Sequence, residues 1–235
     1  MIGLVVVVLC LGLAAFGGLM VLTPSVSNAR AIAQADTAAH HSVYPGPPVP
    51  ARFAAALEAT EDHRFTVEPG IDPFAVLRFL AGPVISKDDQ GGATIYQQLA
   101  KMLYTPGQSG LRVEARQVAL AVKLKYSYSE DEILRLYADI AYFGNNFYGL
   151  SAASCGYFGV TPAGMSWPQA ALMAGLVQGP SADDPLTSPA HAREREEHVI
   201  GRLVAVGKLT AAQARQALAV PLSTLLAHAG QDCRA

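Results

Sequence analysis

Two groups of polar residues have the types and spacing to do chemistry. Glu61 and Asp62 are adjacent carboxylates, and apolar neighbours on both sides favour partial desolvation of one of them, which suits a general base. Between Gly91 and Lys101, paired amides and one lysine follow two adjacent glycines. The first group supplies a candidate base, and the second a candidate cradle for an anionic, oxygen-rich ligand.

The second group is predicted to be the start of a helix that is opened by glycines. Backbone N–H groups at a helix start have no partner within the helix and attract phosphate, and glycines let a ligand approach them closely. Gln97, Gln98 and Lys101 follow on that helix. A glycine-rich turn before a helix is weak evidence by itself, so its meaning depends on the rest of the chain.

The chain begins with an apolar stretch. From Ile2 to Leu22 there is no charged residue, and this length can cross about 30 Å of hydrocarbon as a helix. Either a membrane anchor or a signal peptide fits. The apolar core is longer than the h-region of a secretory signal, which favours an uncleaved anchor over residues 1–23.

Residues 24–50 are rich in Ala, Ser and Pro and end in a proline-rich run, so we expect a linker that holds the folded part away from the membrane. From residue 51 onward the signals are helical, and alternation typical of strands is absent. A folded domain is therefore predicted over residues 51–220, followed by a tail over residues 221–235. Capping signals for helix starts occur at Ser129–Glu132, Ser166–Gln169, Ser188-Pro189 and Thr210–Gln213.

Two other features limit the function classes. The formal net charge of −2 shows no general attraction to nucleic acid. The three cysteines, Cys10, Cys155 and Cys233, have no metal-binding spacing, so neither zinc nor an obligatory disulfide is predicted. The apolar segment 74–85 fits either a core element or a surface that dips into the bilayer.

Several motifs, in order and spacing, resemble the family 51 glycosyltransferases. These are peptidoglycan glycosyltransferases that occur alone or as the first domain of bifunctional penicillin-binding proteins. The resemblance covers roughly residues 51 to 210. It is carried by Glu61-Asp62-x-x-Phe65, by Gly91-Gly92-x-Thr94-Ile95-x-Gln97-Gln98-Leu99-x-Lys101, by Tyr128-Ser129-x-Asp131-Glu132-Ile133-Leu134-x-Leu136-Tyr137, by Tyr142-Phe143-Gly144, and by later matches at Tyr157-Phe158-Gly159, Pro180, Pro189, Arg195 and Val199.

The resemblance implies an all-α, lysozyme-like domain in two lobes. The apolar run places an N-terminal transmembrane helix before it. The resemblance also implies that lipid II is polymerised into glycan strands by attack of a GlcNAc 4-hydroxyl on the anomeric carbon of the growing chain, with inversion and loss of undecaprenyl pyrophosphate. Glu61 holds the family's position for the base. The implied substrate-binding residues are Asp62, Phe65, Gly91, Gly92, Thr94, Gln97, Gln98 and Lys101.

One departure from the family pattern concerns its second acidic residue. That position falls on Gln117, which carries no charge. Glu114 lies three residues earlier, on nearly the same helical face, and Arg112 and Arg116 stand near the displaced basic positions. Compensation by these residues and simple drift on a solvated helix are equally compatible with the sequence.

Three functions remain open. The leading one is a peptidoglycan glycosyltransferase with Glu61, Gln117 and Glu114 as its catalytic set and with Arg112 and Arg116 among its ligands. The second is a weak or inactive scaffold that binds lipid II or glycan, and the third is a lysozyme-like hydrolase that uses Glu61 as an acid.

The leading function implies a divalent cation, Mg or Mn, with no organic cofactor, and the metal ligands stay unknown. The expected partners are lipid II, the growing glycan strand, the membrane and proteins of cell-wall synthesis or division, without nucleic acid. The expected location is the bacterial inner membrane, crossed once, with the domain on the periplasmic side.

Overall fold

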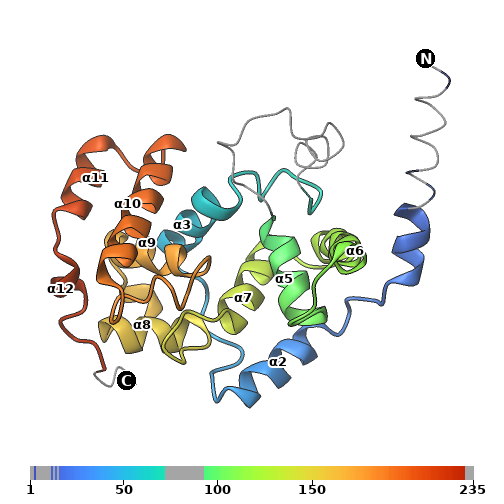
Figure 1. Ribbon diagram of the computed structural model, residues 1–235, viewed down its shortest axis with the longest axis horizontal. Helices are drawn as coiled ribbons and strands as arrows, with labels where there is room; N and C mark the ends of the chain where they lie inside the picture. The colour runs from blue at the N-terminus through green and yellow to red at the C-terminus, as the bar shows by residue number, and fades with distance from the viewer. Residues whose placement is uncertain (1–2, 4–11, 13, 15, 72–92, 231–235) are drawn as a thin grey trace. The chain divides into compact units, whose positions relative to one another are not determined.

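The computed structural model describes residues 3, 12, 14, 16–71 and 93–230 (Figure 1). Helices and irregular connections make up this part of the chain, and its sole β feature is an isolated bridge between Tyr142 and Tyr148. The all-α prediction is therefore confirmed. The apolar segment 74–85 lies outside the described residues, so neither interpretation of it is tested.

The chain divides into two compact units. The first comprises Met1–Ala29 and Glu68–Ile133, and the second comprises Arg30–Val67 and Leu134–Ala235. Each unit is thus assembled from two separate stretches of sequence.

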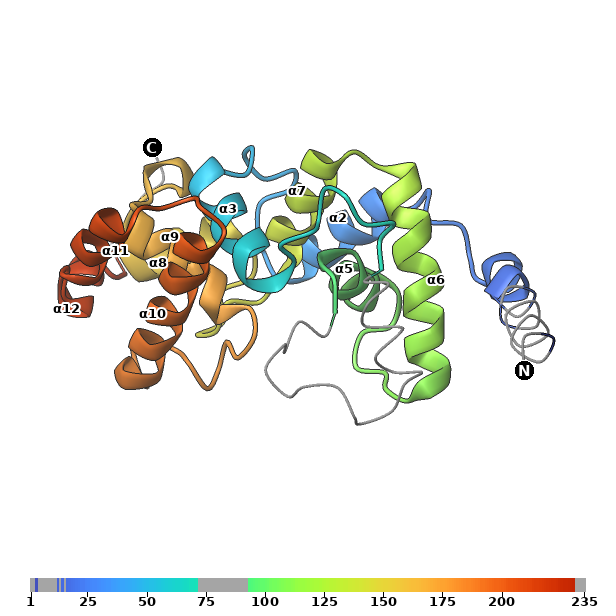
Figure 2. The same ribbon diagram turned by 90° about the horizontal axis from the view of Figure 1, so that it is seen from above.

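In the first unit, helix α5 (Ile95–Tyr104) packs against helix α6 (Leu111–Ser127), and Figure 2 shows the two side by side. Apolar residues at helical spacing bury the shared faces, because burial of such a stripe stabilises both helices. The buried side chains on these faces include Ile95, Leu99, Leu103, Leu120 and Leu124.

The N-terminal segment of the first unit is held to α6. Residues 16–22 are helical. Nζ of Lys123 donates hydrogen bonds to the carbonyl oxygens of Thr23, at 2.7 Å, and Pro24, at 3.0 Å. No helix within the described residues has the length and apolar character needed to span a bilayer. About half of the predicted anchor lies outside the described part.

The second unit is built around helix α9 (Trp167–Leu176), whose residues from Ala170 to Leu176 are all buried. Helices α3 (Ala51–Glu61) and α10 (Pro189–Ala205) pack against it (Figure 1). A Cβ atom on Gly175 would meet Cβ of Arg195 at 3.0 Å, so the glycine permits the close approach of α9 and α10. The other elements are α7 (Glu130–Ile140), which crosses the unit boundary, α8 (Leu150–Phe158), η1 (Pro162–Gly164), α11 (Ala211–Leu218) and α12 (Leu222–Leu225).

The predicted helix starts are confirmed. The Ser129 hydroxyl accepts from the backbone N–H of Glu132, and α7 follows. Ser166–Gln169 and Thr210–Gln213 form capping boxes before α9 and α11, and α10 begins at Pro189. Side-chain caps satisfy backbone groups that the first turn leaves unpaired, so these short signals locate helix starts without tertiary information.

The prediction of a plain linker over residues 24–50 is wrong in its middle part. Helix α2 (Ala29–Ala39) forms there, because Ala29, Ala33 and Thr37 recur every fourth residue and are buried. Gly46 is also bound, since its N–H donates to Asp139 and its carbonyl oxygen accepts from Arg135.

The cysteine and tail predictions need correction too. Cys155 is disulfide-bonded, whereas no disulfide was predicted; Cys10 and Cys233 lie outside the described residues. The tail forms α12, buries Leu225, and returns to α8 through a 2.9 Å hydrogen bond from the Gly230 N–H to the Gly156 carbonyl oxygen. Burial of one leucine and this backbone bond order the tail as far as Gly230.

Candidate active site

The candidate base lies at the C-terminal end of α3 in the second unit. Glu61 is the last residue of the helix and is partly exposed, and Asp62 is the C-cap and is buried. The carbonyl oxygen of Asp62 accepts from the N–H of Phe65, whose ring is 1% exposed. This turn therefore ends α3, buries Phe65 and leaves the Glu61 carboxyl group within reach of solvent.

Arg202 brings a positive charge to the C-terminal end of α3, where Glu61 is the last residue. The C-terminal end of a helix carries partial negative charge, which disfavours a carboxylate there. Nε of Arg202, on α10, donates to the carbonyl oxygen of Ala59 at 3.0 Å. Because this guanidinium binds a carbonyl of the last turn, it stabilises the negative end of the helix that carries Glu61.

A buried tyrosine lies within electrostatic range of the same carboxylate. Tyr137, on α7, is 2% exposed. Burial, and to a lesser extent the negative charge of Glu61, raise the pKa of the Tyr137 phenol. The phenol therefore stays protonated at any physiological pH and keeps its O–H donor.

In the first unit, the start of α5 is fixed by Thr94. Its hydroxyl accepts from the N–H of Gln97 at 3.1 Å and donates to the carbonyl oxygen of Gly70 at 2.9 Å. Oε1 of Gln97 accepts from the N–H of Thr94 and completes a capping box. Thr94 and Gln97, which were predicted as ligands, are thus engaged in holding the helix start. Gly91 and Gly92 lie outside the described residues.

The remaining predicted ligands on α5 have different environments. Nε2 of Gln98 donates to the carbonyl oxygen of Ala93 at 3.3 Å. Lys101 is exposed on the helix surface, two turns beyond Thr94. An exposed ammonium on this helix is able to approach an anionic ligand.

Gln117, at the second acidic position, is held by a neighbour in the same unit. Its Nε2 donates to Oγ1 of Thr105 at 2.8 Å, and Thr105 is fully buried just beyond α5. Glu114 and Arg112 are exposed in the first turn of α6, where the carboxylate of Glu114 also stabilises the helix dipole. Arg116 is partly exposed one turn further on. Sequence reasoning missed Thr105 because its role depends on the packing of α5 on α6.

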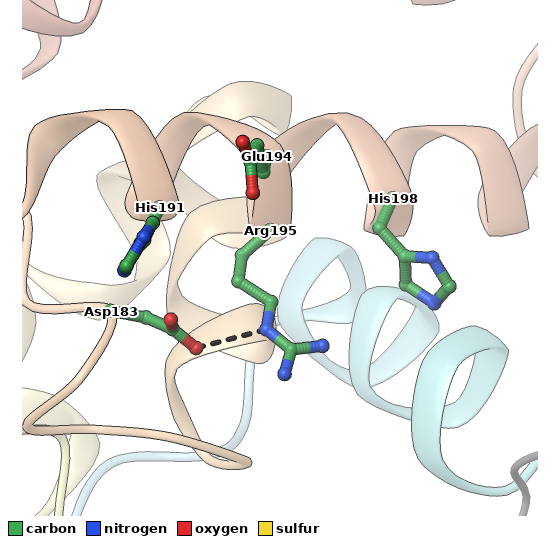
Figure 3. Close-up of a pocket in the computed structure, with 5 residues that line it drawn as sticks. All are labelled: Asp183, His191, Glu194, Arg195 and His198. Atoms are coloured by element: carbon green, nitrogen blue, oxygen red, sulfur yellow. Dashed lines mark hydrogen bonds and ion pairs between the residues drawn. The ribbon is translucent and has the colours of Figure 1, made fainter.

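The second unit also contains a polar cavity of about 350 Å³ along α10 (Figure 3). Asp183 enters it from the loop before α10, and Arg195 donates from Nε to Oδ2 of Asp183 at 2.9 Å. Burial, followed by the charges of Arg195 and Arg202, lowers the pKa of His198. The cavity is lined by Asp183, His191, Glu194, Arg195 and His198.

The predicted residues are thus divided between the units. Glu61, Asp62 and Phe65 belong to the second unit, and all other described members of the predicted site belong to the first. Within the first unit, α5 packs on α6, and Gln117 of α6 is thereby held against Thr105, just beyond α5. The described residues include no group of three or more His, Cys, Asp or Glu side chains that could hold a metal ion.

A comparison with family models matches residues 28–204 to the model described as Transglycosylase. The chain belongs to the transglycosylase family. This match includes α2, so the family domain begins within the segment that was predicted as a linker.

Similar proteins occur in several bacteria. The chain is 36% identical over 171 residues to penicillin-binding protein 2a of Streptococcus pneumoniae, covering 73% of this chain and 23% of that protein. It is 34% identical over 180 residues to penicillin-binding protein 1A of Aquifex aeolicus, covering 74% of this chain and 24% of that protein. A Cupriavidus necator protein named as a transglycosylase is 31% identical over 174 residues, covering 74% of this chain and 75% of that protein. The chain therefore spans about a quarter of the length of the penicillin-binding proteins.

Among solved structures, penicillin-binding protein 1A from Haemophilus influenzae matches with 26% identity and a TM-score of 0.38, covering 55% of this chain and 16% of that chain.

In this transglycosylase, three features of the second unit were not among the predicted site residues. Tyr137 and Arg202 are brought to the end of α3 only by tertiary packing. The residues that line the cavity along α10, in contrast, have a recognisable spacing in the sequence. His191, Arg195 and His198 are spaced by four and three residues after Pro189, which places them on one helical face.

Proposed function

We propose that this transglycosylase is a peptidoglycan glycosyltransferase that polymerises lipid II into glycan strands with inversion and release of undecaprenyl pyrophosphate. The observation that carries the proposal is Glu61 at the exposed end of α3. Arg202, from α10, donates a hydrogen bond to a carbonyl of the last turn of that helix, and the Tyr137 phenol is within electrostatic range of Glu61.

In the proposed reaction, Glu61 accepts the proton of the GlcNAc 4-hydroxyl while that oxygen bonds to the anomeric carbon of the growing strand. The bond between this carbon and the pyrophosphate oxygen breaks, and the leaving group carries away the electron pair. The developing negative charge requires cations or N–H donors. Lys101, Arg112 and Arg116 are the exposed or partly exposed cations of the first unit that suit this role.

A divalent cation, Mg or Mn, belongs to the proposal as a partner of the pyrophosphate. The described residues offer no cluster for a cage made only of protein ligands. Mg²⁺ in such reactions is commonly bound by substrate phosphate oxygens together with one or two carboxylates. When bound, the ion would neutralise charge on the leaving group, while Glu61 and the basic residues act as described above.

A second candidate function is a catalytically weak scaffold that binds lipid II or glycan. The observation in its favour is Gln117, whose amide is hydrogen-bonded to Thr105 and supplies no second charge. A hydrolase that uses Glu61 as an acid is less favoured, because the glycine-opened run and Lys101 have no evident role in simple hydrolysis.

Labelled lipid II, purified full-length chain and a divalent cation distinguish these functions. The glycosyltransferase predicts long glycan from the wild type and none from Glu61→Gln. Glu58→Gln makes the same change one turn earlier on α3 and should keep the activity. Binding without product in wild type and Glu61→Gln would identify the scaffold, and shortening of preformed glycan would identify the hydrolase.

Attachment to the cytoplasmic membrane through residues 1–23, with the domain on the periplasmic side, is part of the same proposal. The uncharged run from Ile2 to Leu22 supports it. Proteins of cell-wall synthesis or division are the proposed partners. Membrane fractionation and protease treatment of intact spheroplasts test the location. The protease is expected to cleave the domain from outside, and protection of the domain would contradict a periplasmic location.

A further inference from the structure

The cavity along α10 has the features of a binding site that the proposed reaction leaves unused. Four of its residues, His191, Glu194, Arg195 and His198, lie on one face of α10. Asp183 faces them from the preceding loop. All five belong to the second unit. The volume of about 350 Å³ is at the small end of the range for ligand sites.

Arg195 is oriented by an ion pair that occupies one edge of its guanidinium. Nε donates to Oδ2 of Asp183 at 2.9 Å, and Asp183 is 8% exposed. Figure 3 shows the two terminal nitrogens of Arg195 pointing away from Asp183. No described residue accepts a hydrogen bond from these nitrogens. A guanidinium fixed at one edge presents a planar pair of donors, which matches a carboxylate.

The other charges of the cavity oppose a simple anion. Asp183 and Glu194 carry two negative charges against the one positive charge of Arg195. Desolvation and the neighbouring charges of Arg195 and Arg202 lower the pKa of His198, which disfavours a positive charge on its ring. Glu194 is exposed and makes no ion pair within the described residues. A ligand with a carboxylate alone would therefore meet an excess of negative charge.

We propose that this cavity binds the zwitterionic end of an amino acid, with the carboxylate on Arg195 and the adjacent ammonium on Glu194. The source that fits a glycan polymerase is the peptide carried by its substrate, where a diamino acid can end in both groups. That source rests on the proposed function, whereas recognition of the zwitterion rests on the cavity alone.

Three compounds with similar chains test the recognition. 2,6-Diaminopimelate has a zwitterion at each end, pimelate has only the carboxylates, and 1,5-diaminopentane has only ammonium groups. Titration of the full-length chain in detergent, followed by calorimetry or by the NMR signals of the histidine rings, should give at least about tenfold tighter binding for diaminopimelate. Equal binding of pimelate would overturn the proposal in favour of a plain anion site, and equal binding of the diamine would overturn it in favour of a cation site.

Two variants locate the binding. Glu194→Gln changes an exposed side chain and should weaken binding of diaminopimelate about three- to fivefold. Arg195→Gln should weaken it about tenfold or more, and circular dichroism establishes whether that variant folds. Glu197→Gln is a matched control on the same helix, outside the cavity, and should bind like the wild type. Unchanged binding in Glu194→Gln would exclude the assigned ammonium position.

A final comparison identifies the source and separates this inference from the proposed function. A disaccharide peptide that ends in diaminopimelate should bind at least about tenfold tighter than free diaminopimelate, and amidation of the terminal carboxylate should remove the gain. Equal affinity would overturn the assignment to a peptide on the substrate. Because these are binding measurements, they remain informative if no polymerisation is detected.

Discussion

Gln117 on α6 donates a hydrogen bond of 2.8 Å from Nε2 to Oγ1 of Thr105, a fully buried residue that follows α5. The amide is thus held in one orientation at the position where the family resemblance predicts a second carboxylate. Glutamine has the length of glutamate but no charge, and its amide nitrogen donates hydrogen bonds, whereas a carboxylate only accepts them. It preserves the contact between the two helices while the charge is lost.

Gln117→Glu should raise the rate of lipid II polymerisation by about tenfold if the missing charge limits it. The carboxylate can keep the contact, since the Thr105 hydroxyl can rotate to donate to it. Glycan formation over time is the measurement. Thr105→Val is the control: it removes the hydrogen bond without adding charge, should cost about 1 kcal/mol of stability, and should not increase the rate. An unchanged or lower rate in folded Gln117→Glu would show that the charge is not limiting.

Thr94→Ala should lower the free energy of unfolding by about 2 kcal/mol, because it removes a helix cap together with the donor to the Gly70 carbonyl. Thr210→Ala removes an equivalent capping box at an exposed site and should cost only about 1 kcal/mol. Urea denaturation of both variants gives the comparison. Equal losses would mean that the bond to Gly70 adds nothing.

Glu196 should make stability depend on pH. Its side chain is fully buried beside Arg193, and burial raises the pKa of Glu196 from 4.5 to about 7. Between these values the folded chain retains a proton that the unfolded chain releases, so the free energy of unfolding falls as pH rises and levels off above pH 7. The loss is on the order of 3 kcal/mol.

Glu196→Gln should remove this contribution, so the stability difference between wild type and variant should change from pH 5 to pH 7 and stay constant at higher pH. Urea denaturation at four pH values measures it. Glu197→Gln alters an exposed carboxylate on the same helix and should keep the wild-type slope. If the free energy of unfolding of Glu196→Gln depended on pH as that of the wild type does, Glu196 would not be the source of the pH dependence.

Arg202→Gln should destabilise the protein by about 1 to 2 kcal/mol, because a charged donor to the Ala59 carbonyl is lost at the negative end of α3. It should also reduce polymerisation, since Glu61 loses a nearby cation. Arg215→Gln, on the exposed side of α11, is the control and should change neither property. Denaturation and the glycan assay report both effects, and identical behaviour of the two variants would contradict the role of Arg202.

The failed predictions share a physical cause. The Ala-rich segment 24–50 was interpreted as a linker because alanine and serine give weak local signals, yet α2 forms when Ala29 and Ala33 find a surface on which to be buried. Likewise Cys155 has no informative spacing, and the tail after Pro221 has no periodicity, so pairing and burial of these parts depend on neighbours distant in sequence.

The sequence by itself determined the all-helical class, the helix starts marked by capping boxes, the family and the location of Glu61 at the end of its helix. These properties depend on neighbours within one or two helical turns and on motif spacing. Only the tertiary structure decided that Thr105 holds Gln117, that Arg202 reaches the end of α3 from 143 residues away, and that Asp183 and Arg195 line one cavity. Such contacts join side chains whose separation in the chain leaves no periodic signal, and they exist only once the helices have packed.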